Sequence, residues 1–338
     1  MLPAIFGLTG LALTDAERSF FRSADPLGFI LFARNVADRA QLRALTDELR
    51  SLTGRDDLPI LVDQEGGRVA RLGPPDWLIY PAASDLAKGF HEDPARTVRL
   101  VEINFEALAL DLFEVGISVN TAPVLDVLTD ITHQVIGDRA FGAEGMQVAR
   151  LGRACLNGLR LGGVAGVIKH IPGHGRASLD SHEALPVVHT MDRQLDRDLL
   201  PFMQLADAPM AMTAHVKYTA WDSDNCATLS RSVIHEVIRS RIGFDGLLMT
   251  DDLDMKALKG SVPELAVEAI AAGNDVVLNC WAKMEDMEGI AAALPSATPK
   301  CLERLQAAMR GLSPVVSRAT ISERQIALLD ERDRLMQS

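Results

Sequence analysis

Cysteine is scarce in this chain. Its four residues lie far apart and form no Cys-x-x-Cys pair: Cys155, Cys226, Cys280 and Cys301. Such spacing favours free thiols over a disulfide framework or a zinc knuckle, and free thiols persist in a reducing compartment, so we expect a cytoplasmic protein. No Lys or Arg precedes the apolar segment Met1–Leu13, as a signal peptide would require, and we interpret this segment as containing the first strand.

Long apolar runs and a surplus of basic residues are also missing. No uninterrupted apolar run approaches the roughly 18 residues that a membrane-spanning helix needs, so we expect no membrane span. The 34 Lys and Arg residues are outnumbered by 46 Asp and Glu residues, which gives a net charge of −12. A surface of this sign repels phosphate backbones and argues against nucleic acid as a partner. The chain has no GxGxxG or P-loop motif, and we assign no phosphate or dinucleotide site.

Short apolar runs recur along the whole chain and alternate with amphipathic segments. The runs, which we interpret as strands, are Ala4–Leu8, Gly28–Phe32, Pro59–Val62, Ile117–Asn120, Val164–Ile168, Pro209–Thr213, Gly246–Met249 and Asp275–Leu278. The helix-like segments between them include Arg39–Leu52, Ala95–Val115, Gln147–Leu161, Arg193–Ala206, Ser232–Ile242 and Glu264–Ala272. Because the runs lack clean polar alternation, they fit strands buried on both faces of a parallel sheet.

Eight strand candidates that alternate with helices predict a single-domain (β/α)8 TIM barrel, an α/β fold, over residues 1–338. Alternation alone does not show that the sheet closes, so a doubly wound open sheet is the structural alternative. No Ser- or Gly-rich linker divides the chain. The charged segment from about 318 to 336 has a few apolar residues, and we expect a helix that packs on the same domain.

Polar side chains stand at the C-terminal ends of most of these strand candidates. They are the Asp63–Arg68 stretch, Asn120 followed by Asp126, Lys169 with His170, His215, Asp251 with Asp252, and Asn279. Strands often end in polar residues because loops are hydrated. In a TIM barrel, however, this end of the strands is the active-site face. Six of the eight candidates end in this way, which favours a barrel with a polar site at that face.

The segment Gly166–His182 joins one such strand end to a polar loop. Pro and Gly residues interrupt regular structure directly after Lys169 and His170. The loop carries Asp180-Ser181-His182, in which a carboxylate can hold one imidazole nitrogen while the other faces a substrate, as general acid/base catalysis requires. The simpler interpretation of this triplet alone is an Asp and a His in a solvated loop.

A metal site fits this loop poorly. His170 and His174 are four residues apart, a spacing that on a helix would place both on one face. Pro172 and Gly173 exclude a helix there, so the geometric reason for the spacing is lost. The first histidine of the chain is His91, which leaves no His-x-His pair after the first strand. We therefore predict no metal.

Asp251 has several possible roles when it is taken alone. After its apolar strand it could be a nucleophile, a metal ligand or a helix cap. Its neighbour Asp252 would point to the opposite face of the strand, so the two carboxylates cannot enter a barrel mouth in the same way. Both faces of this strand carry apolar residues, and the pattern does not choose between them.

Taken together, these motifs resemble glycoside hydrolase family 3, in its β-N-acetylglucosaminidase branch. The matching segments, in chain order, are Gly28–Asn35, Asp63–Arg71, Gly137–Phe141, Lys169–Gly175, Asp180–His182, Met212–His215 and Thr250–Met255. They span nearly the whole chain, and their joint order is highly specific. The departures are Ile171, where Phe is usual, and Asp254, where Ser is common; both lie beside proposed site residues.

The resemblance implies a retaining hydrolysis in two steps. Asp251 matches the family nucleophile, and Asp252 is left to orient loop backbone or a neighbouring cation. His182 would protonate the leaving oxygen and then deprotonate the incoming water, with Asp180 holding its imidazole. This pair would replace the second carboxylate that most retaining glycosidases use.

The resemblance also implies a sugar site and a substrate. The matching sugar-binding positions are Asp63, Arg71, Arg139, Lys169 and His170, whose side chains can accept hydrogen bonds from, or donate them to, hydroxyl and acyl groups. The implied substrate is terminal β-linked N-acetylglucosamine on peptidoglycan fragments, such as its disaccharide with anhydro-N-acetylmuramic acid, in cell-wall recycling. No metal or organic cofactor is implied. Two alternatives are a β-N-acetylglucosaminide phosphorylase on the same fold and a non-catalytic sugar-binding protein.

Overall fold

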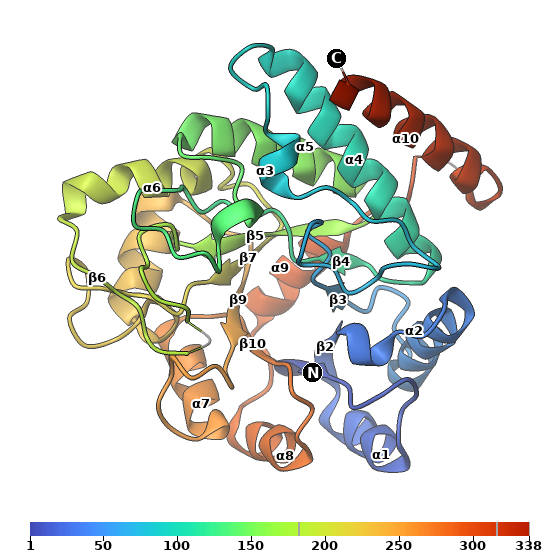
Figure 1. Cartoon of the computed structure of the whole chain (residues 1–338). Coiled ribbons are helices and arrows are strands. Elements are labelled where there is room, and N and C mark those ends of the chain that lie inside the picture. The colour runs from blue at the N-terminus through green and yellow to red at the C-terminus, as the bar shows by residue number, and fades with distance from the viewer. Residues whose placement is uncertain (182, 316, 338) are drawn as a thin grey trace.

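Within residues 1–181, 183–315 and 317–337, which the computed structural model describes, eight parallel strands form a closed barrel (Figure 1). They are β1 (Leu2–Gly7), β2 (Pro26–Leu31), β3 (Ile60–Val62), β4 (Val119–Asn120), β5 (Ala165–Ile171), β7 (Met210–Thr213), β9 (Leu247–Asp252) and β10 (Val276–Asn279). Strand β1 pairs with both β2 and β10, which closes the ring. The predicted TIM barrel is confirmed, and the open-sheet alternative is wrong because the first and last strands are hydrogen-bonded.

Helices surround the barrel. They are α1 (Asp15–Ala24), α2 (Arg39–Thr53), α3 (Ala83–Leu86), α4 (Pro94–Glu114), α5 (Gly145–Leu161), α6 (Asp192–Gln204), η4 (Val233–Ile242, a π-helix), α7 (Val262–Ala272), α8 (Met284–Ala293), α9 (Pro299–Met309) and α10 (Ile321–Gln337). Shorter elements are the 3₁₀ turns η1 (Ala33–Asn35), η2 (Gly137–Arg139), η3 (Ala227–Leu229) and η5 (Arg318–Thr320), and the strands β6 (Val187–Val188) and β8 (Lys217–Tyr218). Strands β6 and β8 pair in parallel as a separate small sheet.

Local sequence signals explain where several helices begin and end. Thr14 and Glu17 form a capping box at the start of α1, in which each side chain accepts from the backbone N–H of the other residue. At the start of α7, Glu264 Oε2 accepts from the backbone N–H of Ser261 at 3.1 Å. Gly273 ends α7 with a φ of 119°, a conformation that favours glycine. These signals lie within a few residues of each helix end, so the chain carries them before it folds.

The core has two layers, and the inner layer lies inside the barrel. One apolar cluster takes residues from all eight barrel strands, including Val167 of β5 and Met249 of β9. Leu305 and Met309 of α9 belong to the same cluster, so α9 packs on the barrel interior. A larger cluster lies between the strands and the outer helices. Both faces of the strands are therefore buried, which explains why the strand sequences lack polar alternation.

Two strands extend further than their apolar runs. Strand β5 continues through Lys169 and His170 to Ile171, and β9 continues to Asp252. The register shifts between Lys169 and Ile171 where β5 meets β7, and it shifts again where β10 meets the end of β9. Polar residues that the sequence places just beyond these strands thus lie within them, because neighbouring strands still pair with their backbone.

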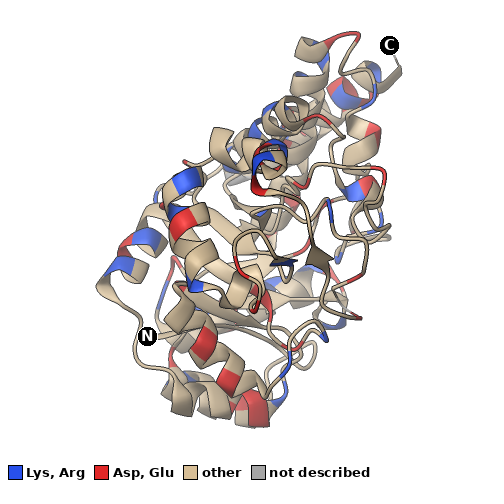
Figure 2. Cartoon of the chain, turned by 90° about the vertical axis from the view of Figure 1, so that its left-hand side faces the viewer, with Lys and Arg blue, Asp and Glu red and all other residues tan. Residues whose placement is uncertain are grey.

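The C-terminal segment is a helix that lies along α4 (Figure 1). It begins at Ile321, after the short turn η5, rather than at about 318. Arg324 forms a bidentate ion pair with the buried Glu106 of α4 at 2.7 and 2.9 Å. Acidic and basic side chains are interspersed on the outer helices (Figure 2). In the described part of the chain, no helix has both the length and the apolar character that crossing a membrane demands.

Candidate active site

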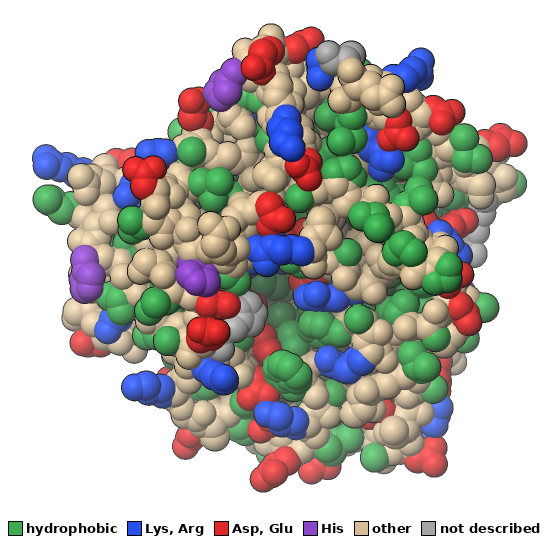
Figure 3. Space-filling view, viewed as in Figure 1, with side chains coloured by type: hydrophobic (Ala, Val, Ile, Leu, Met, Phe, Trp, Pro, Cys, Tyr) green, Lys and Arg blue, Asp and Glu red, His purple; other side chains and the backbone are tan. Residues whose placement is uncertain are grey.

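A cavity of about 1110 Å³ opens at the C-terminal ends of the barrel strands. Figure 3 shows it as a hollow near the centre of this face, bordered by basic and acidic side chains. Its lining includes residues from β2, β5, β7, β9 and β10 and from the loops that follow the strands. This is the face on which the sequence predicts an active site.

The alternation of strand side chains brings charged groups to the cavity floor. Val167 and Met249 belong to the apolar cluster inside the barrel. Two residues further along the same strands, on the same face, are Lys169 and Asp251, and both line the cavity. Along β5 and β9, the side chains that face the barrel interior thus change from apolar to charged within two residues.

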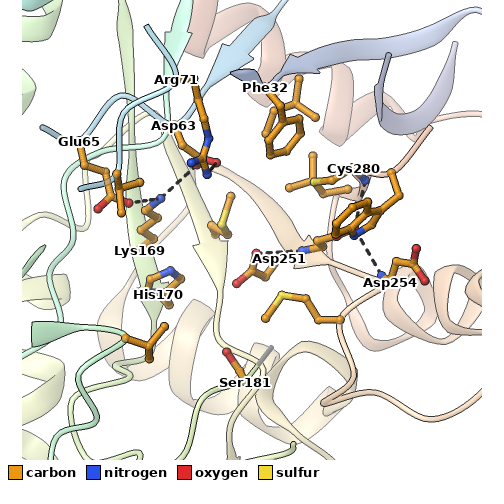
Figure 4. Close-up of a pocket in the computed structure, with 18 of the residues that line it drawn as sticks. Phe32, Asp63, Glu65, Arg71, Lys169, His170, Ser181, Asp251, Asp254 and Cys280 are labelled. Atoms are coloured by element: carbon orange, nitrogen blue, oxygen red, sulfur yellow. Dashed lines mark hydrogen bonds and ion pairs between the residues drawn. The ribbon is translucent and has the colours of Figure 1, made fainter. Parts of the chain in front are cut away.

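His170 joins Lys169 in the cavity although the two are adjacent. Lys169 pairs with Met212 of β7 and Ile171 pairs with Thr213, so His170 is the extra residue of a bulge. A bulge can turn a side chain toward a face that regular alternation would deny it. The Lys169–His170 peptide bond is cis. Both side chains line the cavity, as Figure 4 shows.

Five charged side chains form a network on the β3–β5 side of the cavity. Lys169 Nζ lies 2.6 Å from Glu65 Oε1 and 3.4 Å from Asp63 Oδ1. Arg139 donates two hydrogen bonds to Glu65, Nε to Oε2 at 2.7 Å and Nη2 to Oε1 at 2.8 Å. Arg71 Nη2 lies 2.9 Å from Asp63 Oδ2. The carboxylates and cations are therefore held in fixed mutual positions, several of them visible in Figure 4.

The network keeps its carboxylates ionised. Burial by itself would raise the pKa of Asp63, but Lys169 and Arg71 hold it well below its ordinary value. Burial would likewise raise the pKa of Glu65, and Arg139 and Lys169 instead lower it to about 2. Charged carboxylates accept hydrogen bonds from hydroxyls while the neighbouring cations donate them. Such a cluster suits a polyhydroxylated ligand.

Asp126 orients the two histidines beside this network. Asp126 is buried, and its Oδ2 lies 2.8 Å from His170 Nδ1. Its Oδ1 accepts from the backbone N–H of His174 at 2.6 Å. Burial would raise the pKa of Asp126, but its contacts with His170 and His174 lower it. A carboxylate on Nδ1 leaves Nε2 of His170 for a ligand in the cavity.

His174 is buried at the edge of the cavity, with 3% of its surface exposed. Burial lowers its pKa to about 4, so the ring is neutral near pH 7. Its Nε2 lies 3.3 Å from Ser181 Oγ, and its Nδ1 has no hydrogen-bond partner among the described residues. His174 therefore connects the start of the loop after β5 to its far end at Ser181.

The adjacent carboxylates of β9 have different environments. Burial would raise the pKa of Asp251, but His215, His170 and Lys169 lower it, so this half-buried carboxylate is ionised. Asp252 Oδ1 instead accepts from the backbone N–H of Cys280 at 3.0 Å and of Asp254 at 3.3 Å. Burial raises the pKa of Asp252 to about 6. The family resemblance leaves Asp252 to orient loop backbone or a neighbouring cation, and these contacts are with loop backbone.

Comparison with known proteins identifies this arrangement. The family model described as "Glycosyl hydrolase family 3 N terminal domain" matches residues 12–312. The chain belongs to glycoside hydrolase family 3. The family that the motifs indicated is confirmed, and the chain is a glycoside hydrolase.

Two curated proteins and one solved structure of another protein are similar to this glycoside hydrolase over most of their length. A protein of Bordetella avium is 36% identical over 312 residues, which cover 91% of this chain and 88% of the relative. One of Chromobacterium violaceum is 40% identical over 311 residues, with 90% and 85% covered. Both are named beta-hexosaminidase. Native NagZ from Neisseria gonorrhoeae matches with a TM-score of 0.88 at 29% identity and covers 99% of this chain and 96% of its own; its complex with N-trifluoroacetyl-D-glucosamine matches equally well.

Most of the site residues predicted from the sequence of this glycoside hydrolase come together. Those that line the cavity are Asp63, Arg71, Arg139, Lys169, His170 and Asp251. Asp180 is half-buried and is not among the lining residues. His182 lies outside the described residues. Within the described ranges, no group of three or more His, Cys, Asp or Glu side chains could hold a metal ion.

The predicted set of catalytic and sugar-binding residues omits three residues that the structure places in or beside the site, although two of them, Asp126 and His174, are among the polar residues that follow strands in the sequence. Glu65 stands in the motif Asp63–Arg71, two residues after Asp63, which is the one local signal for it. Nothing local in the sequence marks the partners of Asp126 and His174. The Glu65–Arg139 pair spans 74 residues, so only the folded chain shows it.

Proposed function

We propose that this glycoside hydrolase is a retaining exo-β-N-acetylglucosaminidase, that is, a β-N-acetylhexosaminidase. The observation that supports it most is Asp251, an ionised carboxylate that lines the cavity floor. It shares the cavity with a cluster of paired charges suited to sugar hydroxyls. The relatives named beta-hexosaminidase and the NagZ complex with an N-acyl glucosamine support an N-acetylated hexose as the sugar.

The proposed site divides the sugar contacts by chemistry. Asp63 would accept from sugar hydroxyls, and Arg71 and Lys169 would donate to hydroxyl or acyl oxygens. His170 would contact the sugar through Nε2, since Asp126 occupies its Nδ1. Arg139 also lines the cavity and would contact the ligand while it holds Glu65.

The first proposed step forms a glycosyl-enzyme. An oxygen of Asp251 attacks the anomeric carbon, and the bond from that carbon to the leaving oxygen breaks. His182 donates a proton to the leaving oxygen, and Asp180 supports its imidazole. In the second step water replaces Asp251 at the same carbon, and His182 takes the proton of that water. Two displacements restore the β configuration.

The proposed substrate is a peptidoglycan fragment with terminal β-linked N-acetylglucosamine. Its other sugar would be anhydro-N-acetylmuramic acid, with or without a stem peptide, as the family resemblance implies. We place the enzyme in the cytoplasm, in cell-wall recycling. The four cysteines are buried free thiols, which agrees with a reducing compartment.

Product analysis of purified muropeptides with and without phosphate tests this proposal. We expect free N-acetylglucosamine in both conditions, with the β anomer appearing first in NMR spectra taken during turnover. A sugar phosphate formed only with phosphate would make the enzyme a phosphorylase. The α anomer appearing first would contradict retention, and the inactive Asp251→Asn variant controls for contaminating glycosidases.

The role of His182 is tested with leaving groups of different acidity. His182→Ala should lower kcat/KM on muropeptides by about 10²-fold or more, and far less on aryl substrates whose leaving groups depart without a proton. Asp180→Ala should show a milder form of the same pattern. If both substrate classes lost activity equally, His182 would not be the acid.

A further inference from the structure

The C-terminal helix α10 reaches the active site indirectly. The family match ends at residue 312, and α10 (Ile321–Gln337) follows it. The helix nevertheless contacts the segment of residues 63–82 between β3 and α3, here called the β3 loop. This loop carries five residues that line the cavity, namely Asp63, Glu65, Arg68, Val69 and Arg71.

A glycine turn in the β3 loop packs directly against Tyr80. Gly66 and Gly67 have φ values of 94° and 58°, in the region that favours glycine. The backbone N–H of Gly67 donates to the carbonyl of Tyr80 at 2.8 Å. A Cβ on Gly66 would lie 2.3 Å from the Pro81 carbonyl oxygen, so the two stretches touch. A shift of Tyr80 would therefore displace the turn, together with Glu65 and Arg68 on either side of it.

Tyr80 is hydrogen-bonded to α4. Its side chain is buried, and its hydroxyl donates to Asp111 Oδ2 at 2.8 Å. Burial and the Asp111 carboxylate raise the pKa of the Tyr80 phenol well above its ordinary value, so it stays a donor. Asp111 in turn binds Arg39 of α2 at 2.6 Å. Tyr80 is thus a joint between the outer helices and the β3 loop.

The helix α10 also contacts Tyr80. Gln325 Nε2 lies 3.4 Å from the Tyr80 hydroxyl and 3.1 Å from the Ala107 carbonyl of α4. The Arg332 guanidinium lies 5.9 Å from the centre of the Tyr80 ring. Gln325 and Arg332 are seven residues apart and share one face of α10 with the buried Leu328. Tyr80 itself is not among the residues that line the cavity.

We propose that Tyr80 is a positioning residue of the active site and that α10, through Gln325 and Arg332, holds it in place. The helix would keep the glycine turn where Glu65 and Arg68 face the cavity, and through Glu65 it would keep Lys169 and Arg139 aligned. The inference rests on the proposed role of this cluster in binding the sugar. Asp251 is on the opposite side of the barrel, so sugar binding should suffer more than chemistry.

The test compares variants of α10 that differ in whether they touch Tyr80. Gln325→Met removes the contacts of Nε2 with the Tyr80 hydroxyl and the Ala107 carbonyl, and Tyr80→Phe removes the hydroxyl contacts with Asp111 and Gln325. Both variants keep the bulk of the side chain. Glu331→Gln is the matched control, because it weakens the bidentate Arg99–Glu331 pair between α4 and α10 without touching Tyr80. The measurements are kcat and KM on an aryl N-acetylglucosaminide, the melting temperature, and hydrogen exchange of the amides from Glu65 to Leu72.

We expect Gln325→Met and Tyr80→Phe each to raise KM about three- to tenfold, with kcat within about twofold of the wild type. Exchange in the β3 loop should accelerate, and the double variant should be less than additive because both changes act at one joint. Glu331→Gln should lower the melting temperature while leaving KM and loop exchange unchanged.

Equal changes in KM for Glu331→Gln and Gln325→Met would overturn the proposal, since α10 would then act only through general stability. Unchanged KM and unchanged loop exchange in Tyr80→Phe would overturn it as well. If the wild type does not cleave aryl N-acetylglucosaminides, the proposed function fails instead. Loop exchange still decides the positioning role in that case, because it needs no substrate.

Discussion

The carboxylates on the two sides of the cavity have different partners. On the β3–β5 side, Lys169 and Arg139 both bind the carboxylate of Glu65 at 2.6–2.8 Å. On the β9 side, Asp251 forms no ion pair within the described part of the chain, and its Oδ1 accepts from the backbone N–H of Asp252 at 2.9 Å. A carboxylate whose lone pairs are held by cations is a poor nucleophile, whereas Asp251 is ionised and forms no such ion pair with the described residues. Under the proposed mechanism, the contrast separates a binding side, β3–β5, from a reacting side, β9.

The largest effect should come from the reacting side. Asp251→Asn should lower kcat/KM by about 10⁴-fold or more, even on activated aryl substrates, because the attacking oxyanion is gone. Asp252→Asn should lose less, since an amide oxygen can still accept from the Cys280 and Asp254 backbone. With a slow fluorinated substrate, mass spectrometry and peptide mapping should find the covalent sugar on Asp251. An adduct on Asp252, or none, would reverse the assignment.

A substitution on the binding side should instead lower the stability of the folded protein. Glu65→Ala leaves Lys169 and Arg139 buried without their shared carboxylate, and we expect the free energy of unfolding to fall by about 3–5 kcal/mol in denaturant titrations. Asp85→Asn, which breaks the exposed pair with Lys88, is the control and should cost only a small fraction of that loss. Similar losses in both variants would show that the cluster is not energetically special.

The two sides should also respond to pH with opposite signs. His174 has its pKa lowered to about 4 from 6.5, so the unfolded chain binds more protons between these values and its contribution to stability is lost as pH falls through this window. Asp252 has its pKa raised to about 6 from 3.8, so the folded chain binds more protons there and stability is lost as pH rises. Each contribution is on the order of 3 kcal/mol, and the two largely cancel in the wild type.

Single variants should reveal each slope. Between pH 4 and pH 6, the stability of Asp252→Asn relative to the wild type should rise with pH, because the variant lacks the Asp252 contribution, which falls with pH. The stability of His174→Gln relative to the wild type should fall with pH, because it lacks the His174 contribution, which rises with pH. Chemical denaturation across this range measures both, after subtraction of the wild-type curve. Parallel curves for the two variants would contradict the assigned shifts.

The smallest effect should follow from changing the geometry of one ion pair while keeping its charge. Arg139→Lys replaces two parallel hydrogen bonds to Glu65 with a single point charge. We expect a loss of about 1 kcal/mol in unfolding free energy and a modest rise in KM. A loss as large as that of Glu65→Ala would mean that the fork geometry, rather than charge balance, holds the binding side.

Local sequence is enough to predict the elements of this barrel. Each of the eight apolar runs overlaps a barrel strand, and helices begin and end at caps such as Thr14 and Gly273. These signals act over a few residues. Burial of both strand faces gives every strand an apolar sequence without polar alternation. The polar residues at the strand ends likewise indicate the active-site face. The strands of the barrel are parallel, so their C-terminal ends all lie at that one face.

The choice between Asp251 and Asp252 shows where local pattern ends. Leu247 and Met249 lie inside the barrel, while Leu248 packs outward against the helices. Both faces are apolar, so alternation alone does not identify the interior face, and in the sequence only the family motif favours Asp251. Closure of the barrel decides which face is inside, and it places Asp251 on the interior side.

The charge network depends on tertiary structure even more strongly. Lys169 and Asp63 are 106 residues apart, and Arg139 and Glu65 are 74 apart. Nothing near either residue in the chain marks its partner, since an ion pair needs only proximity in space. The sequence by itself determined the strands, the helices and the polar strand ends, because these depend on local conformation and burial. Only the closed barrel decided which charges meet, because it brings β3, β4 and β5 side by side.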